Sequence, residues 1–181
     1  MEKRLVKVSK FLSLVLRHAP ETIGLTIDEN GWARVDQLIV AATRAGVVLD
    51  EKLLNDVVEH NDKKRFAFSA DGSRIRASQG HSIAIELALE RVEPPEMLYH
   101  GTASRFIESI KEKGLIKGER QHVHLSKDED TATKVGSRHG KPVVLKIASA
   151  RMHSDGFEFF VSANGVWLTK SVPVQYITFS Q

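Results

Sequence analysis

The chain has 181 residues, of which 41% are hydrophobic and 27% are charged, with a formal net charge of +3. This composition is ordinary for a globular protein of one long or two compact domains, and it excludes wholesale disorder. The lack of cysteine excludes disulfides and thiolate catalysis, and no apolar run reaches the roughly 18 residues of a membrane-spanning helix.

The first predicted element is an amphipathic helix over residues 5–18, where apolar side chains recur at steps of three and four. Pro20 and Gly24 end it, which places Arg17 and His18 at its C-terminal end. Charges interrupt this segment and no small-residue cleavage site follows, so we expect no signal peptide and a cytoplasmic protein. Cations stabilise a helix C-terminus by roughly 0.3–1 kcal/mol, so Arg17 and His18 serve either the helix or a ligand.

Short elements with clear turn signals follow. After the Asn30-Gly31 turn we expect a strand over 32–35, a helix over 36–44 capped by Asp36, and a helix over 51–60 capped by Asp50.

The next predicted element is a hairpin. Residues 64–68 and 74–77 form its strands on either side of the Asp71-Gly72 turn. Helices followed by a two-stranded wing indicate a winged-helix domain. The cluster Lys63-Lys64-Arg65 at the start of the hairpin is either a solvated loop or part of a site.

Pro94-Pro95 is the predicted domain boundary, giving lobes 1–93 and 94–181. The first lobe holds 14 Lys and Arg against 14 Asp and Glu, and the second holds 12 against 9. The basic surplus therefore lies in the second lobe. It is compatible with an anionic ligand but does not by itself indicate nucleic acid.

The second lobe is predicted to be a strand-rich α+β domain. Its expected strands and helices alternate along the chain: strand 97–100, helix 103–113, strand 123–125, helix 128–136 capped by Ser126 or Asp128, strand 142–147, and strands 157–160 and 166–169 around an Asn164-Gly165 turn.

The segment RQHVHLS, residues 120–126, carries the strongest local indication of a site. On a strand, Arg120, His122 and His124 share one face and apolar residues take the other. A guanidinium fork suits phosphate because it meets two oxygens at once. The histidines, together with His100, could alternatively bind a metal, although no nearby carboxylate would orient them. Trp32 and Trp167 are most simply core aromatics.

Seven segments in order closely resemble the RNA 2′-phosphotransferase family. They are SKFLSLVLRHAP (9–20), GWARVDQL (31–38), KRF (64–66), IRASQGHS (75–82), LYHGT (98–102), RQHVHLS (120–126) and NGVWLTKSVP (164–173). Each motif is weak alone, but their colinear order over about 165 residues is specific. One departure is Asn30-Gly31-Trp32, where we expect the family to favour Asp-Gly-Trp; both dipeptides make the same turn.

The resemblance implies an α+β architecture, with an N-terminal winged-helix RNA-binding lobe and a C-terminal lobe of the ADP-ribosyltransferase fold that binds NAD. It also implies the removal of an internal 2′-phosphate from RNA, such as the one left by certain tRNA ligases during tRNA splicing. The reaction has two steps and uses no metal. An ADP-ribosylated RNA intermediate gives RNA with a 2′-hydroxyl, nicotinamide and ADP-ribose 1″,2″-cyclic phosphate.

The family's catalytic residues match Arg17, His18, Arg65 and Arg120 by motif. The first three belong to the first lobe and the fourth to the second, so we expect the RNA phosphate to lie between the lobes. His18 either hydrogen-bonds the phosphate or moves a proton.

The resemblance further places the NAD contacts. His100 would hydrogen-bond a ribose, and Gly101 and Thr102 would lie beside the adenosine. His124 and Ser126 would line the nicotinamide ribose. The remaining expected contacts are Asn164 and Gly165. The late glutamate that many protein-modifying relatives use has no match near Asn164, and Glu158 is offset.

We expect a monomer that acts on tRNA-like RNA, with NAD as its co-substrate. Two alternatives remain. One is an ADP-ribosyltransferase that caps nucleic-acid terminal phosphates and stops after the first step. The other is an RNA-binding winged-helix protein with an inactive second lobe, against which the intact Arg-His-Arg-Arg set argues.

Overall fold

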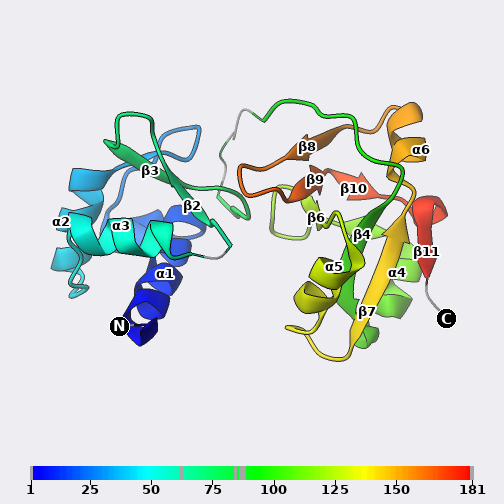
Figure 1. Cartoon of the computed structure of the whole chain (residues 1–181), viewed down its shortest axis with the longest axis horizontal. Coiled ribbons are helices and arrows are strands. Elements are labelled where there is room, and N and C mark those ends of the chain that lie inside the picture. The colour runs from blue at the N-terminus through cyan, green and yellow to red at the C-terminus, as the bar shows by residue number, and fades with distance from the viewer. Residues whose placement is uncertain (1, 62, 84, 86–88, 180–181) are drawn as a thin grey trace. The chain divides into compact units, whose positions relative to one another are not determined.

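The computed structural model describes residues 2–61, 63–83, 85 and 89–179. The chain divides into two compact units, residues 1–88 and 89–181 (Figure 1). Both units combine helices with small antiparallel sheets, which confirms the mixed α and β composition. Among the described residues, no helix is long and apolar enough to span a membrane.

Three helices build the core of the first unit: α1 (Glu2–Arg17), α2 (Val35–Arg44) and α3 (Glu51–Glu59). A 3-10 turn, Pro20–Ile23, follows α1. The predicted periodicity of α1 is confirmed, because the apolar positions Leu12, Val15 and Leu16 are fully buried.

The two predicted helix caps have opposite outcomes. Asp50 caps α3 and accepts a hydrogen bond from the Leu53 N–H at 2.7 Å, as predicted. The prediction that Asp36 caps α2 is wrong, because Arg34 occupies the cap position. Asp36 lies in the first turn, where it forms an ion pair with Arg34 at 2.7 Å and accepts from the Gln37 N–H.

The first unit also contains a three-stranded antiparallel sheet in the order β1-β3-β2, formed by β1 (Ala33–Arg34), β2 (Phe66–Phe68) and β3 (Arg74–Ala77). The predicted hairpin is confirmed, with Gly72 in its turn at a φ of 71°. Phe66 and Ile75 point into the helical core, where they are 3% and 0% exposed. The opposite face of this sheet is therefore not part of the core.

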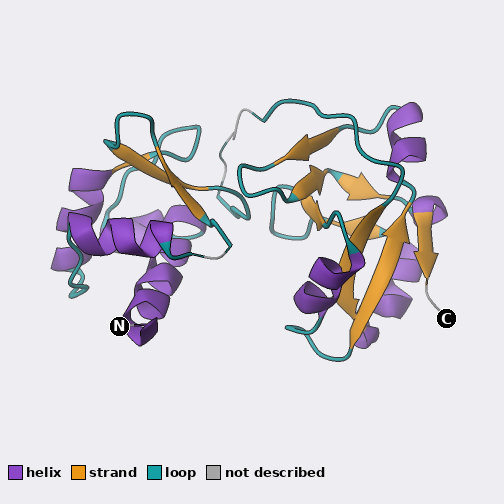
Figure 2. Ribbon diagram, viewed as in Figure 1, coloured by secondary structure: helices purple, strands orange, loops and turns teal. Residues whose placement is uncertain are grey.

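Antiparallel sheets dominate the second unit, as Figure 2 shows. One has the order β11-β7-β4 and another the order β6-β9-β8. The strands are β4 (Leu98–Ala103), β5 (Leu115–Ile116), β6 (Val123–Leu125), β7 (Pro142–Ile147), β8 (Phe159–Val161), β9 (Trp167–Thr169), β10 (Ser171–Val172) and β11 (Ile177–Phe179), with β5 and β10 pairing separately.

A backbone bridge between Tyr99 and Ser126 joins the two larger sheets. The Tyr99 N–H donates to the Ser126 carbonyl at 2.9 Å, and the Ser126 N–H donates to the Tyr99 carbonyl at 2.7 Å. Because Tyr99 lies on β4 and Ser126 directly follows β6, the bridge brings His100 close to the end of β6.

The helices of the second unit are α4 (Ile107–Lys113), preceded by a 3-10 turn (Ser104–Phe106), α5 (Glu129–Gly136) and α6 (Ser149–Ser154). Asp128 caps α5, since its carboxylate accepts from the Thr131 N–H at 2.7 Å. Helix α5 packs on β4 with almost no space between the backbones. A Cβ atom at Gly101 would fall on the Ala132 carbonyl, and one at Gly136 would strike the backbone of Thr102.

Candidate functional site

Arg17 and His18 lie at the C-terminal end of α1, where residue Ser82 holds both of them. The Ser82 N–H donates to the Arg17 carbonyl at 2.9 Å, which satisfies one of the carbonyls that a helix end leaves open. The Ser82 hydroxyl is 2.9 Å from His18 Nδ1. This contact joins residues 64 positions apart in the sequence and fixes the orientation of the imidazole.

His81 is buried beside this pair and is only 1% exposed. Burial, and then the nearby charges of Arg17, His18 and Arg76, lower its pKa to about 3. Among the described residues, neither of its ring nitrogens has a hydrogen-bond partner. His81 is therefore a neutral imidazole at physiological pH.

Arg65 is held by the same stretch of chain that ends at Ser82. The Ser78 N–H donates to the Arg65 carbonyl at 2.8 Å, and the Ser78 hydroxyl donates to the Lys64 carbonyl at 3.0 Å. Lys64 has a φ of 41°, an uncommon backbone conformation for a residue with a side chain.

The spacing of these anchors limits how far apart the three predicted residues are. Four residue steps separate Ser78 from Ser82, a span of at most about 14 Å. Arg17, His18 and Arg65 are thus anchored to one short segment of the first unit.

In the second unit, Arg120 and His100 both contact His124. Arg120 donates from Nη1 to His124 Nδ1 at 3.2 Å, and His100 Nδ1 is 2.9 Å from the His124 carbonyl. A carbonyl only accepts, so His100 carries its proton on Nδ1 and presents an unprotonated Nε2. Burial lowers the pKa of His100, and Arg120 and His139 lower it further, against the hydrogen bond to the carbonyl. The second unit therefore places one cation beside two imidazoles.

The prediction that Arg120, His122 and His124 share a face of one strand is wrong. Strand β6 covers only Val123–Leu125, and Arg120 reaches His124 from the bend before it. His122 packs against Phe160, with the ring centroids 5.7 Å apart. Burial and the charge of Lys117 lower the pKa of its imidazole.

The alternative of a metal site concerns His100, His122 and His124. His122 packs against Phe160, while His100 and Arg120 both contact His124. Within the part of the chain that the structure describes, no three His, Asp or Glu side chains are grouped closely enough to hold a metal ion.

The other predicted NAD contacts lie at β4, at the end of β6 and in the β8–β9 turn. Gly101 packs against α5, and Thr102 is 6% exposed. The Asn164-Gly165 turn precedes β9, whose residue Trp167 pairs with Leu125, so this turn lies at the end of the sheet from which Ser126 emerges. Asn164 Oδ1 accepts from the Ser162 hydroxyl at 2.6 Å. Their roles toward NAD stay predictions.

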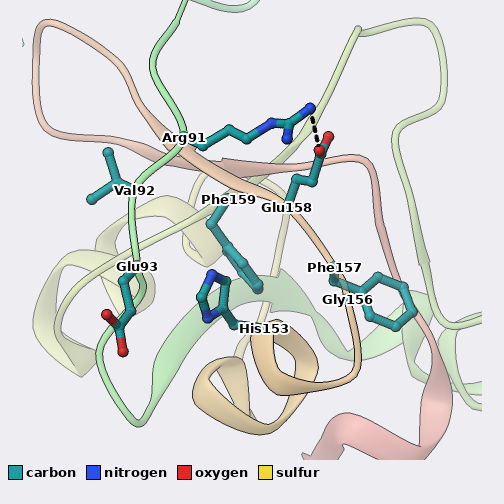
Figure 3. Close-up of a pocket in the computed structure, with 8 residues that line it drawn as sticks. All are labelled: Arg91, Val92, Glu93, His153, Gly156, Phe157, Glu158 and Phe159. Atoms are coloured by element: carbon teal, nitrogen blue, oxygen red, sulfur yellow. Dashed lines mark ion pairs between the residues drawn. The ribbon is translucent and has the colours of Figure 1, made fainter.

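Glu158 lies elsewhere, on the rim of a cavity of about 250 Å³. It forms an ion pair with Arg91 at 2.6 Å, as Figure 3 shows. The cavity is lined by Arg91, Val92, Glu93, His153, Gly156, Phe157, Glu158 and Phe159, and none of these is a predicted site residue.

Trp167 is partly buried against the core of the second unit, which agrees with the interpretation of it as a core aromatic. The same interpretation of Trp32 is wrong. The centroid of its ring lies 4.5 Å from the Arg76 guanidinium carbon and 5.5 Å from that of Arg74, on the face of the sheet away from the core.

Sequence reasoning also missed His81 and Ser82. Both belong to the segment IRASQGHS, which carried the resemblance, but it contains no pattern that assigns them a partner. The contact of Ser82 with His18 depends on tertiary structure.

Cationic and imidazole side chains on firmly anchored backbone characterise both units, and such groups suit the recognition of a phosphate. Side chains of this kind are typical of proteins that bind phosphorylated ligands. The family model described as "RNA 2'-phosphotransferase, Tpt1 / KptA family" matches residues 3–171, and the chain belongs to this family.

Curated relatives match over nearly their full length. The chain is 60% identical over 172 residues to a "Probable RNA 2'-phosphotransferase" from Flavobacterium johnsoniae, covering 95% of this chain and 94% of the relative. Proteins with the same description from Pseudomonas aeruginosa and Pectobacterium atrosepticum are 58% and 52% identical, covering 97% and 98% of this chain and 97% and 99% of the relatives.

Proposed function

We propose that the protein is an NAD-dependent RNA 2′-phosphotransferase that acts on an internal 2′-phosphate. The first unit would bind the RNA, and the second would bind NAD as a co-substrate. The observation that carries the proposal is the anchoring of the Arg17-His18 pair by Ser82, because it fixes the backbone of Arg17 and the imidazole of His18 on the unit proposed to receive the RNA phosphate.

In the first step, an oxygen of the RNA 2′-phosphate forms a bond to C1″ of the nicotinamide riboside. The C1″–N bond breaks, and its electron pair leaves with nicotinamide. The attacking phosphate is already an anion, so it needs orientation more than activation. Arg17 and Arg65 of the first unit, with Arg120 of the second, would supply that orientation through charged hydrogen bonds.

In the second step, the 2″-hydroxyl oxygen attacks phosphorus, and the bond from phosphorus to the RNA 2′-oxygen breaks. The proton that the 2″-hydroxyl loses balances the one that the 2′-oxygen takes up to become the 2′-hydroxyl, and ADP-ribose 1″,2″-cyclic phosphate is released. Negative charge gathers on the phosphoryl oxygens, where fixed cations stabilise the transition state. The loss of one such donor typically lowers the rate by a factor of about 10²–10³.

His100 fits the ribose contact that the family resemblance implies. Its Nδ1–H is engaged by the His124 carbonyl, so the unprotonated Nε2 would accept a hydrogen bond from a ribose hydroxyl. Arg120 donates to His124 Nδ1, which orients that imidazole. The second unit would therefore offer the Nε2 acceptor of His100 to a nucleotide ribose.

The test is incubation of the protein with an RNA that carries one internal 2′-phosphate, with and without NAD, followed by separation of the RNA and the small molecules. We expect NAD-dependent loss of the phosphate together with nicotinamide and ADP-ribose cyclic phosphate. Accumulation of ADP-ribosylated RNA alone would favour a capping transferase. No reaction would contradict both enzymatic functions.

A further inference from the structure

The outer face of the first unit's sheet carries an unusual set of side chains. Alternation along the strands directs Ala33, Ile75 and Ala77 to the core, so their neighbours point outward. Arg34 pairs directly with Arg74, and Ala67 pairs with Arg76. We call the outward set the arginine face; it consists of Trp32, Arg34, Arg74 and Arg76.

Two of these arginines contact the ring of Trp32. Arg76 lies 4.5 Å and Arg74 5.5 Å from the centre of the indole, within the range of cation–π contacts. The Asp28 carboxylate accepts from the backbone N–H of Trp32 at 2.8 Å, and the Asp28 N–H donates to the Trp32 carbonyl at 2.9 Å. The backbone that carries the indole is therefore fixed by its own turn.

The charge of the arginine face is only partly balanced. Arg34 pairs with Asp36 at 2.7 Å, and Arg74 is 3.6 Å from Asp28. Arg76 is half-buried, and burial lowers its pKa, while the charge of Asp28 opposes that change. Three guanidinium groups thus face two carboxylates, which leaves a net positive surface with donors for anionic groups.

The arginine face is continuous along the chain with the predicted phosphate site. From Arg76, strand β3 leads within a few residues to Ser82, which holds His18. Arg65, another predicted phosphate ligand, lies two residues before Ala67, the partner of Arg76. An RNA whose 2′-phosphate lay at His18 and Arg65 would have its neighbouring nucleotides within reach of this face.

We propose that the arginine face binds the single-stranded nucleotides next to the 2′-phosphorylated position. Arg74 and Arg76 would contact their backbone phosphates, and the planar indole of Trp32 would pack against their bases. Cationic donors combined with planar side chains are what single-stranded RNA requires from a protein. This inference rests on the proposed function.

The experiment compares two RNAs with the same internal 2′-phosphate: a trinucleotide, and a longer strand with single-stranded nucleotides on both sides. We expect the wild-type protein to show a lower KM for the longer RNA. In Arg74→Gln and in the double variant R74Q/R76Q, most of that KM advantage should disappear. The matched control is Arg44→Gln, which removes an exposed arginine at the end of α2.

The salt dependence of RNA affinity distinguishes contacts to the RNA phosphates from packing against the bases. For the double variant, the slope of log affinity for the longer RNA against log salt should fall by about 1.4, roughly 0.7 for each RNA phosphate that the variant no longer neutralises. The variant R74K/R76K keeps both charges, so it should keep most of the slope while it loses affinity with the planar groups. Circular dichroism would show whether each variant is folded. If the double variant does not fold, Arg74→Gln still tests the inference, because Arg74 lies at an exposed position.

The outcomes distinguish this inference from the proposed function. If the wild-type protein converts neither RNA, the proposed function itself fails. If it converts both with equal KM, or if Arg74→Gln keeps the full advantage and salt slope of the longer RNA, the function stands and the arginine face is not the binding surface.

Discussion

Ser82 is the residue through which His18 is positioned, because its hydroxyl lies 2.9 Å from the imidazole Nδ1. The substitution Ser82→Ala removes this contact and retains the backbone bond to Arg17. We expect kcat for 2′-phosphorylated RNA to fall about fivefold to tenfold, equivalent to roughly 1–1.4 kcal/mol for one hydrogen bond. Steady-state rates with saturating NAD would measure it.

Two further variants make the Ser82 test specific. Ser82→Thr keeps the hydroxyl and should recover most of kcat. Ser73→Ala removes an exposed hydroxyl from the hairpin, where it bonds to Asp71, and should leave kcat unchanged. A Ser82→Ala protein with the wild-type kcat would show that the tether has no part in turnover.

His81 makes the stability of the first unit depend on pH. Its pKa is about 3 in the folded chain against an ordinary value of 6.5. Between these values the unfolded chain binds a proton that the folded chain does not. The free energy of unfolding therefore falls as the pH drops below 6.5, by about 1.4 kcal/mol per pH unit from this group.

The variant His81→Gln should flatten this dependence. We expect the loss of stability between pH 7 and pH 5 to be smaller than in the wild type by about 2 kcal/mol, measured by urea unfolding. His60→Gln, at the exposed end of α3, is the control. Parallel stability curves for wild type and His81→Gln would mean that His81 already binds a proton in the folded protein.

Among the elements, α5 and β4 form the contact with the least room for change. The substitution Gly101→Ala would place a Cβ atom on the Ala132 carbonyl of α5, so the helix must move. We expect a loss of about 3 kcal/mol or more in unfolding free energy. The control Gly118→Ala has open space but a φ of 60°, and should cost only about 1 kcal/mol. Equal losses in the two variants would contradict the close packing.

The elements that sequence predicted well are those with a strong local signal. The stripe of α1, the Asp50 cap and the Asp71-Gly72 hairpin each lie within one short stretch of chain. The β5–β10 pair was not predicted, because it joins two-residue strands more than fifty positions apart. Asp36 was misassigned because the helix begins at Val35, one residue earlier than predicted, so that Asp36 lies in its first turn and not before it.

At the scale of the whole molecule, the predicted catalytic residues are divided between the units: Arg17, His18 and Arg65 belong to the first and Arg120 to the second. Family motifs in the sequence identified these residues, whereas the contacts that hold them in place are seen only in the tertiary structure. Ser82 contacts His18, which is 64 positions away in the sequence, and the ring of Trp32 contacts arginines of another strand. A linear sequence read alone contains neither contact.

The proposed reaction relies on arginines and histidines, so chelation of divalent metals should leave its rate unchanged. We expect the same initial rate after dialysis against excess EDTA as before it, with RNA and NAD at fixed concentrations. Restoration of a lost rate by added Mg²⁺ or Zn²⁺ would contradict a metal-independent mechanism. In that event the histidines around Arg120 would be the first residues to re-examine.

The bond between Ser82 and His18 has a consequence for the protonation of the imidazole. A hydroxyl can rotate, so it donates to a bare Nδ1 and accepts from a protonated one with equal ease. A carboxylate in its place would only accept and would favour the charged ring. With serine, this hydrogen bond to the imidazole can form in either protonation state of the ring.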